Sequence, residues 1–277
     1  MLLSSAILVR EAYAKGYAIA AFDIVDLETG KAVLDASEAM HSPVILMIWE
    51  EGFIVLHPIW LPALRKMAES SPVPVSIALD HGTSRDSVLE AIQMGCTGVM
   101  FDGSTLPFDE NVRISAELAR IAHAAGVGFE AEIGHVGEAE DMSTCVLTEP
   151  ADAEKFVSAT GVDALAVAIG TAHGQYRTAP QIDFDRLKSI HQVVDIPLVL
   201  HGSSGTPAED IRRCIQLGIS KVNIYTDIVL KARQHLMECV DHGEILDWLG
   251  AINQGIREEV CFYLELVGSG GRAREFE

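Results

Sequence analysis

The chain has 277 residues, 49% of them hydrophobic, and its 40 acidic and 20 basic side chains give a net charge of −20. An acidic excess of this size argues against nucleic acid or an anionic membrane as a partner. We expect no secretory leader and no membrane span, because neither pattern occurs in the sequence. The five cysteines form no metal-binding spacing, so we expect reduced thiols and a cytoplasmic protein.

Short apolar, strand-like segments alternate with helical patterns along the chain. Strands are predicted at 18–22, 43–48, 74–79, 98–101, 127–132, 163–169, 197–201 and 220–225. Helices are predicted near 27–40, 58–70, 84–95, 109–125, 150–160, 183–194, 207–217 and 226–242. Eight strand–helix units predict an α/β protein with a parallel (β/α)8 TIM barrel, and a doubly wound open sheet is the alternative.

No linker or abrupt change in composition divides the chain. We therefore expect one domain over residues 1–277, with the barrel at about 18–242 and a helical extension at 243–277. The helices of this extension are expected to pack on the barrel or on a neighbouring subunit. Its last residues follow the glycine-rich stretch 268–271 and are expected to be mobile.

Three histidines, each followed by glycine, come directly after predicted strands three, six and seven: His81, His173 and His201. The carboxyl ends of barrel strands meet at one mouth, where such enzymes do their chemistry. One histidine there is explained as a satisfied polar residue, but three at equivalent positions are typical of a catalytic zinc site. The other seven histidines are expected on the surface or in packing positions.

Carboxylates accompany these histidines. Asp80 precedes His81, and it either orients a ligand and moves protons or caps the next helix. Glu130 and Glu132 alternate in strand five, where a charge is costly unless it is paired or functional. Glu132 is the better candidate for the metal neighbourhood because it lies nearer the carboxyl end.

Two connections at the expected mouth have distinctive compositions. Residues 134–148 are long for a connection in such a barrel and rich in acids, which predicts either a mobile active-site loop or a solvated acidic loop. Small residues follow strands seven and eight at 202–205 and 222–227. Their free backbone N–H groups, leading into helix N-termini, predict an anion cradle.

Taken together, these segments make the chain resemble the class II, metal-dependent ketose-bisphosphate aldolases, the fructose- and tagatose-bisphosphate aldolase group, as a divergent member. The resemblance extends from about residue 18 to 227. Its carriers are the segments 79–82, 101–104, 130–134, 161–174, 198–205 and 221–223.

The resemblance implies a role for each matching residue. It implies one Zn²⁺ per subunit on the three histidines, with Glu132 beside the metal as a neighbour or alternate ligand. Asp80 would be the acid/base at the aldehyde oxygen, and Glu140 would remove the ketone's α-proton. Lys221 receives no Schiff-base role. The ketone phosphate and a monovalent cation such as Na⁺ or K⁺ would be held around Gly174, Gly202, Ser204, Asn223 and Thr226.

The implied activity is reversible cleavage of a ketose or ketose (bis)phosphate into a dihydroxyacetone(-phosphate)-type ketone and an aldehyde, through a metal-stabilised enediolate. A small sugar or sugar phosphate would be the partner, and a homodimer or homotetramer the assembly. Two alternatives stay open: a metal-dependent sugar isomerase or epimerase on the same barrel, and a catalytically silent sugar-binding barrel.

The chain departs from the family pattern in the shell that should hold substrate. Aspartates replace asparagines at two positions, glutamine and serine become Met47 and Trp49, a glycine becomes a serine, and an Asn or Asp becomes a tyrosine. The departures are Asp23, Asp26, Met47, Trp49, Ser203 and Tyr225. We expect them all at the mouth, and we expect a substrate other than fructose 1,6-bisphosphate, one that lacks a phosphate at one or both ends.

Overall fold

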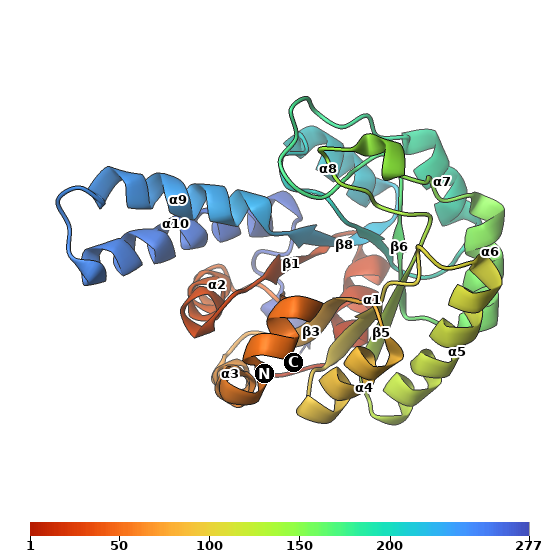
Figure 1. Cartoon of the computed structure of the whole chain (residues 1–277), viewed down its shortest axis with the longest axis horizontal. Coiled ribbons are helices and arrows are strands. Elements are labelled where there is room, and N and C mark those ends of the chain that lie inside the picture. The colour runs from red at the N-terminus through yellow and green to blue at the C-terminus, as the bar shows by residue number, and fades with distance from the viewer. Residues whose placement is uncertain (277) are drawn as a thin grey trace.

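The strands form a closed parallel barrel in which each strand pairs with its sequence neighbours and the eighth returns to the first. The computed structural model describes residues 1–276, and for residues 51–59 it describes the backbone alone. The strands are β1 Ile19–Asp23, β2 Val44–Trp49, β3 Val75–Gly82, β4 Gly98–Phe101, β5 Gly128–Ile133, β6 Ala164–Val167, β7 Leu198–Leu200 and β8 Ile219–Ile224 (Figure 1). The predicted (β/α)8 barrel is confirmed, and the open sheet is excluded.

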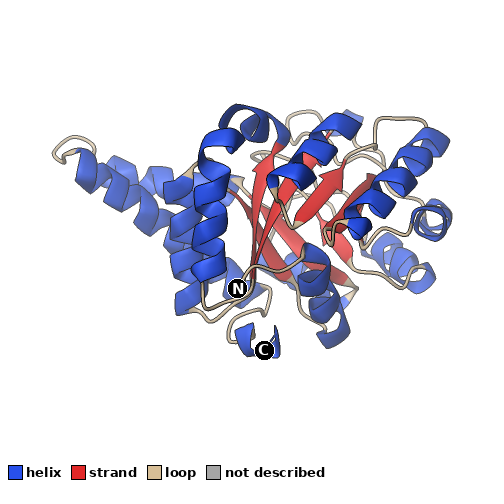
Figure 2. Ribbon diagram, turned by 90° about the horizontal axis from the view of Figure 1, so that it is seen from below, coloured by secondary structure: helices blue, strands red, loops and turns tan. Residues whose placement is uncertain are grey.

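Helices surround the strands on every side, as Figure 2 shows from below. They are α1 Ser5–Lys15, α2 Leu27–Ala39, α3 Glu50–Ser70, α4 Arg85–Met94, α5 Phe108–Ala124, α6 Pro150–Thr160, α7 Phe184–Val193, α8 Ala208–Gln216, α9 Thr226–Cys239 and α10 Ile245–Leu266. Short 3-10 turns lie at Met142–Thr144 and Ala273–Phe276. The outward faces of the strands pack on these helices and form the main core.

Two helices differ from the prediction. α1 was not predicted, and its buried Leu8, Val9 and Ala12 pack with the inward-facing residues of the barrel, so that α1 closes the N-terminal end. α3 begins at Glu50, directly after β2, and not near residue 58. A glycine and a proline in this stretch of sequence favoured a loop over a helix.

Alternate strand residues point into the barrel, and their register defines layers. Asp23 pairs with Met47, and Trp49 pairs with Asp80, which brings Trp49 and Asp80 to the carboxyl rim. Met47 lies one layer deeper, fully buried in the interior cluster that includes Ile45. The expectation that Met47 faces the mouth is therefore wrong, because the two-residue strand period puts it below Trp49.

The C-terminal extension packs on its own chain. α10 lies against α9 and α2, and α9 and α10 project together from the barrel (Figure 1). The glycine-rich stretch that follows is tied down in its described part. Gly271 N–H donates to the Met40 carbonyl at 2.9 Å, and the Ser42 hydroxyl bonds that of buried Ser269 at 2.8 Å. Backbone groups beyond α10 are therefore paired with the turn after α2, and the expected mobility of the last residues stays a prediction.

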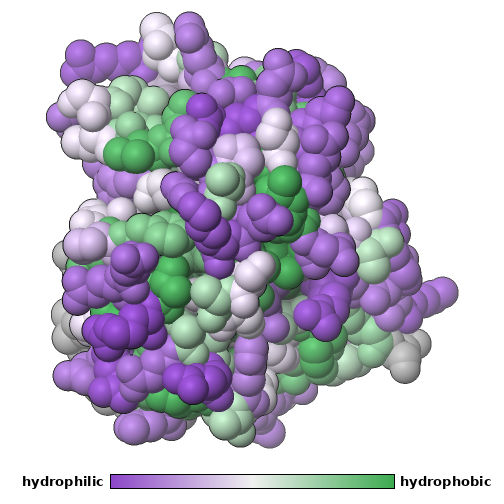
Figure 3. Space-filling view, turned by 90° about the vertical axis from the view of Figure 1, so that its right-hand side faces the viewer, coloured by the Kyte–Doolittle hydropathy of each residue, from purple (hydrophilic) through white to green (hydrophobic). Residues whose placement is uncertain are grey.

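On the face seen in Figure 3, hydrophilic side chains dominate and apolar ones gather in small separate patches. Within residues 1–276, no helix combines the length and apolar character needed to cross a membrane.

Candidate active site

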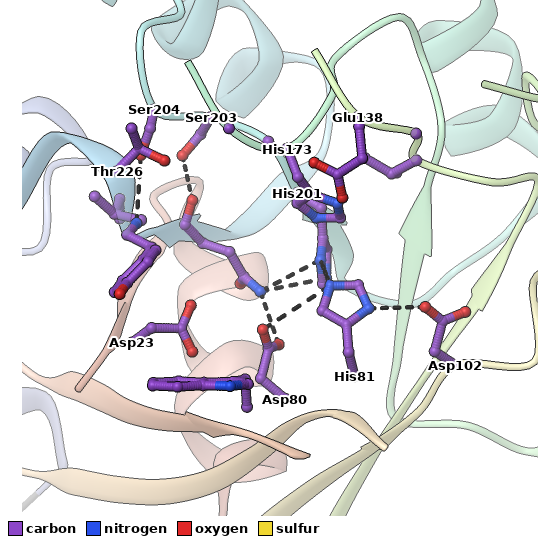
Figure 4. A pocket seen from close by; sticks show the side chains of 18 of the residues that line it. Asp23, Asp80, His81, Asp102, Glu138, His173, His201, Ser203, Ser204 and Thr226 are labelled. Atoms are coloured by element: carbon purple, nitrogen blue, oxygen red, sulfur yellow. Dashed lines mark hydrogen bonds and ion pairs between the residues drawn. The ribbon is translucent and has the colours of Figure 1, made fainter. Parts of the chain in front are cut away.

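A cavity of about 600 Å³ opens at the carboxyl ends of the strands. Residues at or just after the ends of β1, β2, β3, β4, β7 and β8 line it, together with residues of the loops after β5 and β6 (Figure 4). The predicted site residues among its lining are Asp80, His81, His173, Gly174, His201, Gly202, Ser204, Asn223 and Thr226. Two predicted residues, Glu132 and Glu140, are not in the lining.

The three predicted histidines converge in this cavity. One ring nitrogen from each lies within 4.8 Å of the others. His201 Nδ1 is 2.9 Å from His81 Nε2, and His173 Nε2 is buried without a hydrogen-bond partner. The strand-end geometry explains how adjacent Asp80 and His81 both face inward. The β3–β4 register shifts after Leu79, and His81 has a left-handed φ of 47°.

In two of these imidazole rings, one nitrogen contacts a carboxylate. His81 Nδ1 is 2.8 Å from Asp102 Oδ2, and His201 Nε2 is 3.1 Å from Glu130 Oε1. The second oxygen of Glu130 accepts from the Lys221 ammonium at 2.7 Å, deep in the barrel. The charge of Glu130 in strand five is thus paired, and Lys221 is occupied in an ion pair.

Burial and neighbouring charges set the protonation of the cluster. Burial and the other two imidazoles lower the pKa of His173 to about 2, and burial also lowers the pKa of His201. For His81, burial acts in the same direction but Asp80 and Asp102 outweigh it, so its pKa rises to about 10. Two of the three rings are therefore neutral near pH 7, the form in which imidazole binds a metal.

These residues fit a zinc ion. Three imidazole nitrogens converge, and one of the three rings, His173, has a buried nitrogen without a hydrogen-bond partner. Two of the rings are backed by carboxylates, the usual arrangement around a metal-bound histidine. The three ligands leave room in the cavity for a substrate atom at the fourth position of a catalytic site.

Glu132 lies beside this cluster, fully buried under the cavity floor. Its Oε1 accepts from the Val136 N–H at 2.9 Å, while Oε2 has no partner. Glu132, His81 and Asp102 form a second group with ligand atoms within 4.8 Å. Burial first, and then the charge of Asp102, raise the pKa of Glu132 to about 8.

Asp80 is almost fully buried at the end of β3. Its Oδ1 accepts from the Asn223 side-chain amide at 3.2 Å, and its Oδ2 is 3.9 Å from His81 Nε2. The same amide nitrogen lies 3.3 Å from His201 Nε2. Asp80 therefore lies within the cluster at a fixed position. The alternative that it caps a helix does not hold, because Ser84 caps α4.

The loop after β5 lies along the cavity beside His173. Gly137 and Ala139 exchange backbone hydrogen bonds with His173, and Glu138 reaches the cavity. Figure 4 shows the Glu138 carboxylate next to the His173 ring. Glu140 is exposed in the turn that follows and lies outside the cavity lining.

Small residues after β6, β7 and β8 form another wall of the cavity. A side chain at Gly202 would lie 2.3 Å from the Ala172 carbonyl, and its φ of 63° also favours glycine, so the chain after β7 packs tightly on the segment after β6 where Gly202 lines the cavity. The Ser204 hydroxyl accepts from the Tyr225 and Asp227 N–H groups at the start of α9. Thr226, the first residue of α9, presents that helix N-terminus to the cavity, as an anion site requires.

Several cavity residues escaped the sequence reasoning. Asp102 was part of a matched segment without an assigned role, Glu138 was noted only as part of an acidic loop, and His135 was expected on the surface or in packing. The signal for Asp102 was its place directly after β4, the same strand-end position that drew attention to the histidines. His135 had no such signal, because it is a loop residue held by the Ser104 hydroxyl, 2.8 Å from Nδ1.

The other residues that differ from the family pattern lie at different depths in the barrel. Trp49 and Tyr225 both line the cavity, with ring centroids 6.1 Å apart. Ser203 is buried and its hydroxyl donates to the Asn223 carbonyl. Asp23 lines the cavity between these walls. Asp26 follows the carboxyl end of β1 but does not line the cavity; it caps α2, where its side chain accepts from the Thr29 N–H at 2.7 Å.

Comparison with known proteins agrees with this geometry. A family model described as fructose-bisphosphate aldolase class-II matches residues 4–272. The crystal structure of the YdjI aldolase from Escherichia coli K12 is 34% identical over 99% of this chain and 100% of that chain, with a TM-score of 0.90.

A fructose-bisphosphate aldolase from Campylobacter jejuni shares the fold at 21% identity, with a TM-score of 0.82 over 97% of this chain and 96% of that one. Nothing in these comparisons supports the isomerase or the silent-barrel alternative. The chain belongs to the class II fructose-bisphosphate aldolase family and is an aldolase, a carbon–carbon lyase.

Proposed function

We propose that the protein is a zinc-dependent aldolase that reversibly cleaves a ketose phosphate into a dihydroxyacetone-phosphate-type ketone and an aldehyde. The observation that carries this proposal is the convergence of His81, His173 and His201, two of them backed by carboxylates. Zinc bound there would draw electron density from the ketone carbonyl and so acidify the neighbouring C–H group. Glu132, with one unsatisfied oxygen beside His81, is the proposed neighbour or alternate ligand.

The proposed role of Asp80 is to hold and transfer the proton at the aldehyde oxygen. In the cleavage direction the carboxylate removes the hydroxyl proton as the carbon–carbon bond breaks, and in synthesis it returns that proton. The Asn223 amide bonds one oxygen of Asp80 and leaves the other toward the cavity. This contact supports a fixed orientation for the acid/base.

For the α-proton of the ketone, the proposed base is Glu140. Its present position outside the cavity lining requires the loop 134–148 to move when substrate binds, so the predicted mobility of this loop remains a prediction. Glu138 is the competing candidate, because it already lines the cavity beside His173.

Replacing each acid by glutamine decides between them. We expect Glu140→Gln to slow exchange of the ketone α-proton with solvent deuterium by about 10²–10⁴-fold, the usual contribution of a general base. Glu138→Gln, two residues away in the same loop, is the matched control and is expected to lose less. Exchange rates followed by NMR with dihydroxyacetone phosphate measure this. A larger loss in Glu138→Gln would reassign the base to Glu138.

The ketone phosphate is proposed to bind the wall after β6, β7 and β8. Gly174, Gly202 and Ser204 supply close backbone or hydroxyl groups, and Asn223 near the end of β8 and Thr226 at the start of α9 complete the set. A bound Na⁺ or K⁺ at this wall stays a prediction.

A screen tests the proposed function directly. Ketoses, ketose 1-phosphates and ketose 1,6-bisphosphates are incubated with the zinc-loaded enzyme, and release of ketone and aldehyde is followed. We expect cleavage of at least one phosphorylated ketose, and a substrate other than fructose 1,6-bisphosphate to be preferred. Deuterium exchange or isomerisation without any cleavage would count against an aldolase acting on sugars.

We propose that the chain acts as one domain in a homodimer or homotetramer. Support comes from the projecting α9–α10 pair, which carries exposed apolar side chains such as Leu246, 78% exposed, and Met237, 57% exposed. Apolar surface of this kind is typical of contacts between subunits. A cytoplasmic location is proposed because all five cysteines are free, as expected for a reducing compartment.

A further inference from the structure

The charges around the cavity are distributed unevenly. Among its described lining residues none is lysine or arginine, whereas five are acidic: Asp23, Glu50, Asp80, Asp102 and Glu138. The Lys221 ammonium below the floor is bonded to Glu130 and does not line the cavity. A phosphate dianion in this cavity must therefore rely on backbone and hydroxyl donors.

Such donors lie on one side of the cavity. Gly174, Ser204 and Thr226 form that wall, and they also line an adjoining cavity of about 240 Å³ that contains Arg177. The N-terminus of α9 and the Arg177 guanidinium therefore both lie beside this wall. One phosphate, that of the ketone half, has a suitable environment here.

The side formed by the ends of β1, β2 and β3 has the opposite character. Asp23 is the last residue of β1, Glu50 directly follows β2, and Asp80 lies near the end of β3. Glu50 is fixed toward Thr83, whose N–H and hydroxyl donate to Glu50 Oε2 at 3.0 and 2.6 Å. A second phosphate on this side would meet three acidic side chains and no described lysine or arginine, an environment that disfavours an anion.

An aromatic wall completes this side. Trp49 from β2 and Tyr225 from the end of β8 have ring centroids 6.1 Å apart and planes inclined by 45°. Both replace smaller or polar residues of the family pattern. Aromatic faces bury the C–H groups of a carbon chain at little entropic cost, whereas they offer nothing to a phosphate.

Asp23 lies between the wall and Asp80, and one of its oxygens is unsatisfied. Oδ1 is sealed from solvent and has no hydrogen-bond partner, although the residue lines the cavity. Figure 4 shows its carboxyl group facing the interior of the pocket near Asp80. A buried polar atom without a partner is unfavourable, and a ligand hydroxyl at this point would satisfy it.

We propose that the β1–β3 side of the cavity is a subsite for the neutral, hydroxylated carbon chain of the aldehyde, with Asp23 as its specificity-determining residue and Trp49 and Tyr225 as its wall. The inference rests on the proposed aldolase function and narrows it: the substrate is a ketose 1-phosphate whose other end carries hydroxyl groups and no phosphate.

The test compares matched substrates that differ by one phosphate. The ratio of kcat/KM is measured for fructose 1-phosphate against fructose 1,6-bisphosphate, and for the corresponding tagatose pair, in the zinc-loaded enzyme. We expect kcat/KM to favour the monophosphate of at least one pair by about tenfold or more. The second phosphate of the bisphosphate would be repelled and left unpaired. A ratio near one or a preference for the bisphosphate in both pairs would overturn the inference.

Two variants test whether Asp23 and Trp49 determine the preference for the monophosphate. Asp23→Asn and Trp49→Ser restore the residues of the family pattern, and each is expected to reduce the monophosphate preference at least threefold. The ratio is internal to each variant, so a general loss of activity does not affect it. Asp26→Asn is the matched control. It removes one negative charge three residues away, keeps a residue that caps α2 well, and should leave the ratio unchanged.

The outcomes separate the inference from the function on which it rests. If dihydroxyacetone phosphate exchanges its α-proton but both variants retain the wild-type ratio, the aldolase proposal stands and the subsite assignment is wrong. If neither exchange nor cleavage of any ketose phosphate occurs, the proposed function fails and the inference fails with it. If Asp23→Asn does not fold, Trp49→Ser with the same substrate pairs still decides.

Discussion

Replacing His173 by alanine is expected to remove the metal and the cleavage activity together. Its Nε2 is buried without a partner, and one of its ring nitrogens belongs to the group of three within 4.8 Å, so the substitution deletes a candidate ligand and leaves two. Loss of a residue that merely supports a metal ligand lowers affinity by about 10–100-fold. Loss of a ligand itself should exceed that. Zinc per chain after gel filtration and the retro-aldol rate measure the two effects.

His135→Ala is the matched control for this experiment. His135 lines the same cavity, but its Nδ1 bonds the Ser104 hydroxyl and its ring is outside the three-histidine group. This variant should retain its zinc. A His173→Ala protein with full zinc and full turnover would show that the metal site is misassigned.

Removal of the Asp80 carboxylate is expected to separate the two halves of the reaction. Asp80→Ala should slow carbon–carbon cleavage by about 10²–10⁴-fold, because the proton at the aldehyde oxygen loses its acid/base. Exchange of the ketone α-proton should fall less, since it depends on a carboxylate from the loop after β5. Steady-state cleavage and deuterium exchange, measured on the same preparation, give both numbers.

A check on metal content accompanies the Asp80 variant. Asp80 Oδ2 is 3.9 Å from His81 Nε2, and a change that also released zinc would depress both reactions for a different reason. With zinc retained, equal loss of cleavage and exchange would contradict the division of labour between Asp80 and the loop acid.

The barrel and the three-histidine group could be predicted because both rest on local patterns. Each strand is a short apolar segment with a helix after it, and the histidines cluster at the carboxyl ends: His81 near the end of β3, His201 directly after β7 and His173 in the loop after β6. The rim of a closed parallel barrel then brings these points together, whatever the details of packing. The pairing of Glu130 with Lys221 followed the same logic only in part. The cost of a buried charge indicated that Glu130 would be paired or functional, and the structure shows the pair with Lys221.

What could not be predicted depends on contacts between segments that are distant in sequence. α1 closes the barrel because its apolar face meets the inward-facing layer, which no local pattern reveals. The docking of the tail on the turn after α2 is a contact of the same kind.

The depth of a side chain along its strand could not be predicted either. Met47 and Trp49 are two residues apart on the same inward face, yet the first lies in the core and the second lines the cavity. Loop residues were the least accessible to sequence reasoning. The position of Glu138 in the cavity, with Glu140 outside it, follows from the backbone bonds between the loop and His173.

Zinc dependence is the central claim, and a metal titration tests it most directly. The wild-type enzyme is stripped with a chelator, its cleavage of a ketose phosphate accepted by the native enzyme is measured, and zinc is added back in steps. The three-histidine site predicts negligible cleavage without metal and a linear recovery that ends at one zinc per chain. Full cleavage by the stripped enzyme, or recovery unrelated to zinc bound, would contradict the account.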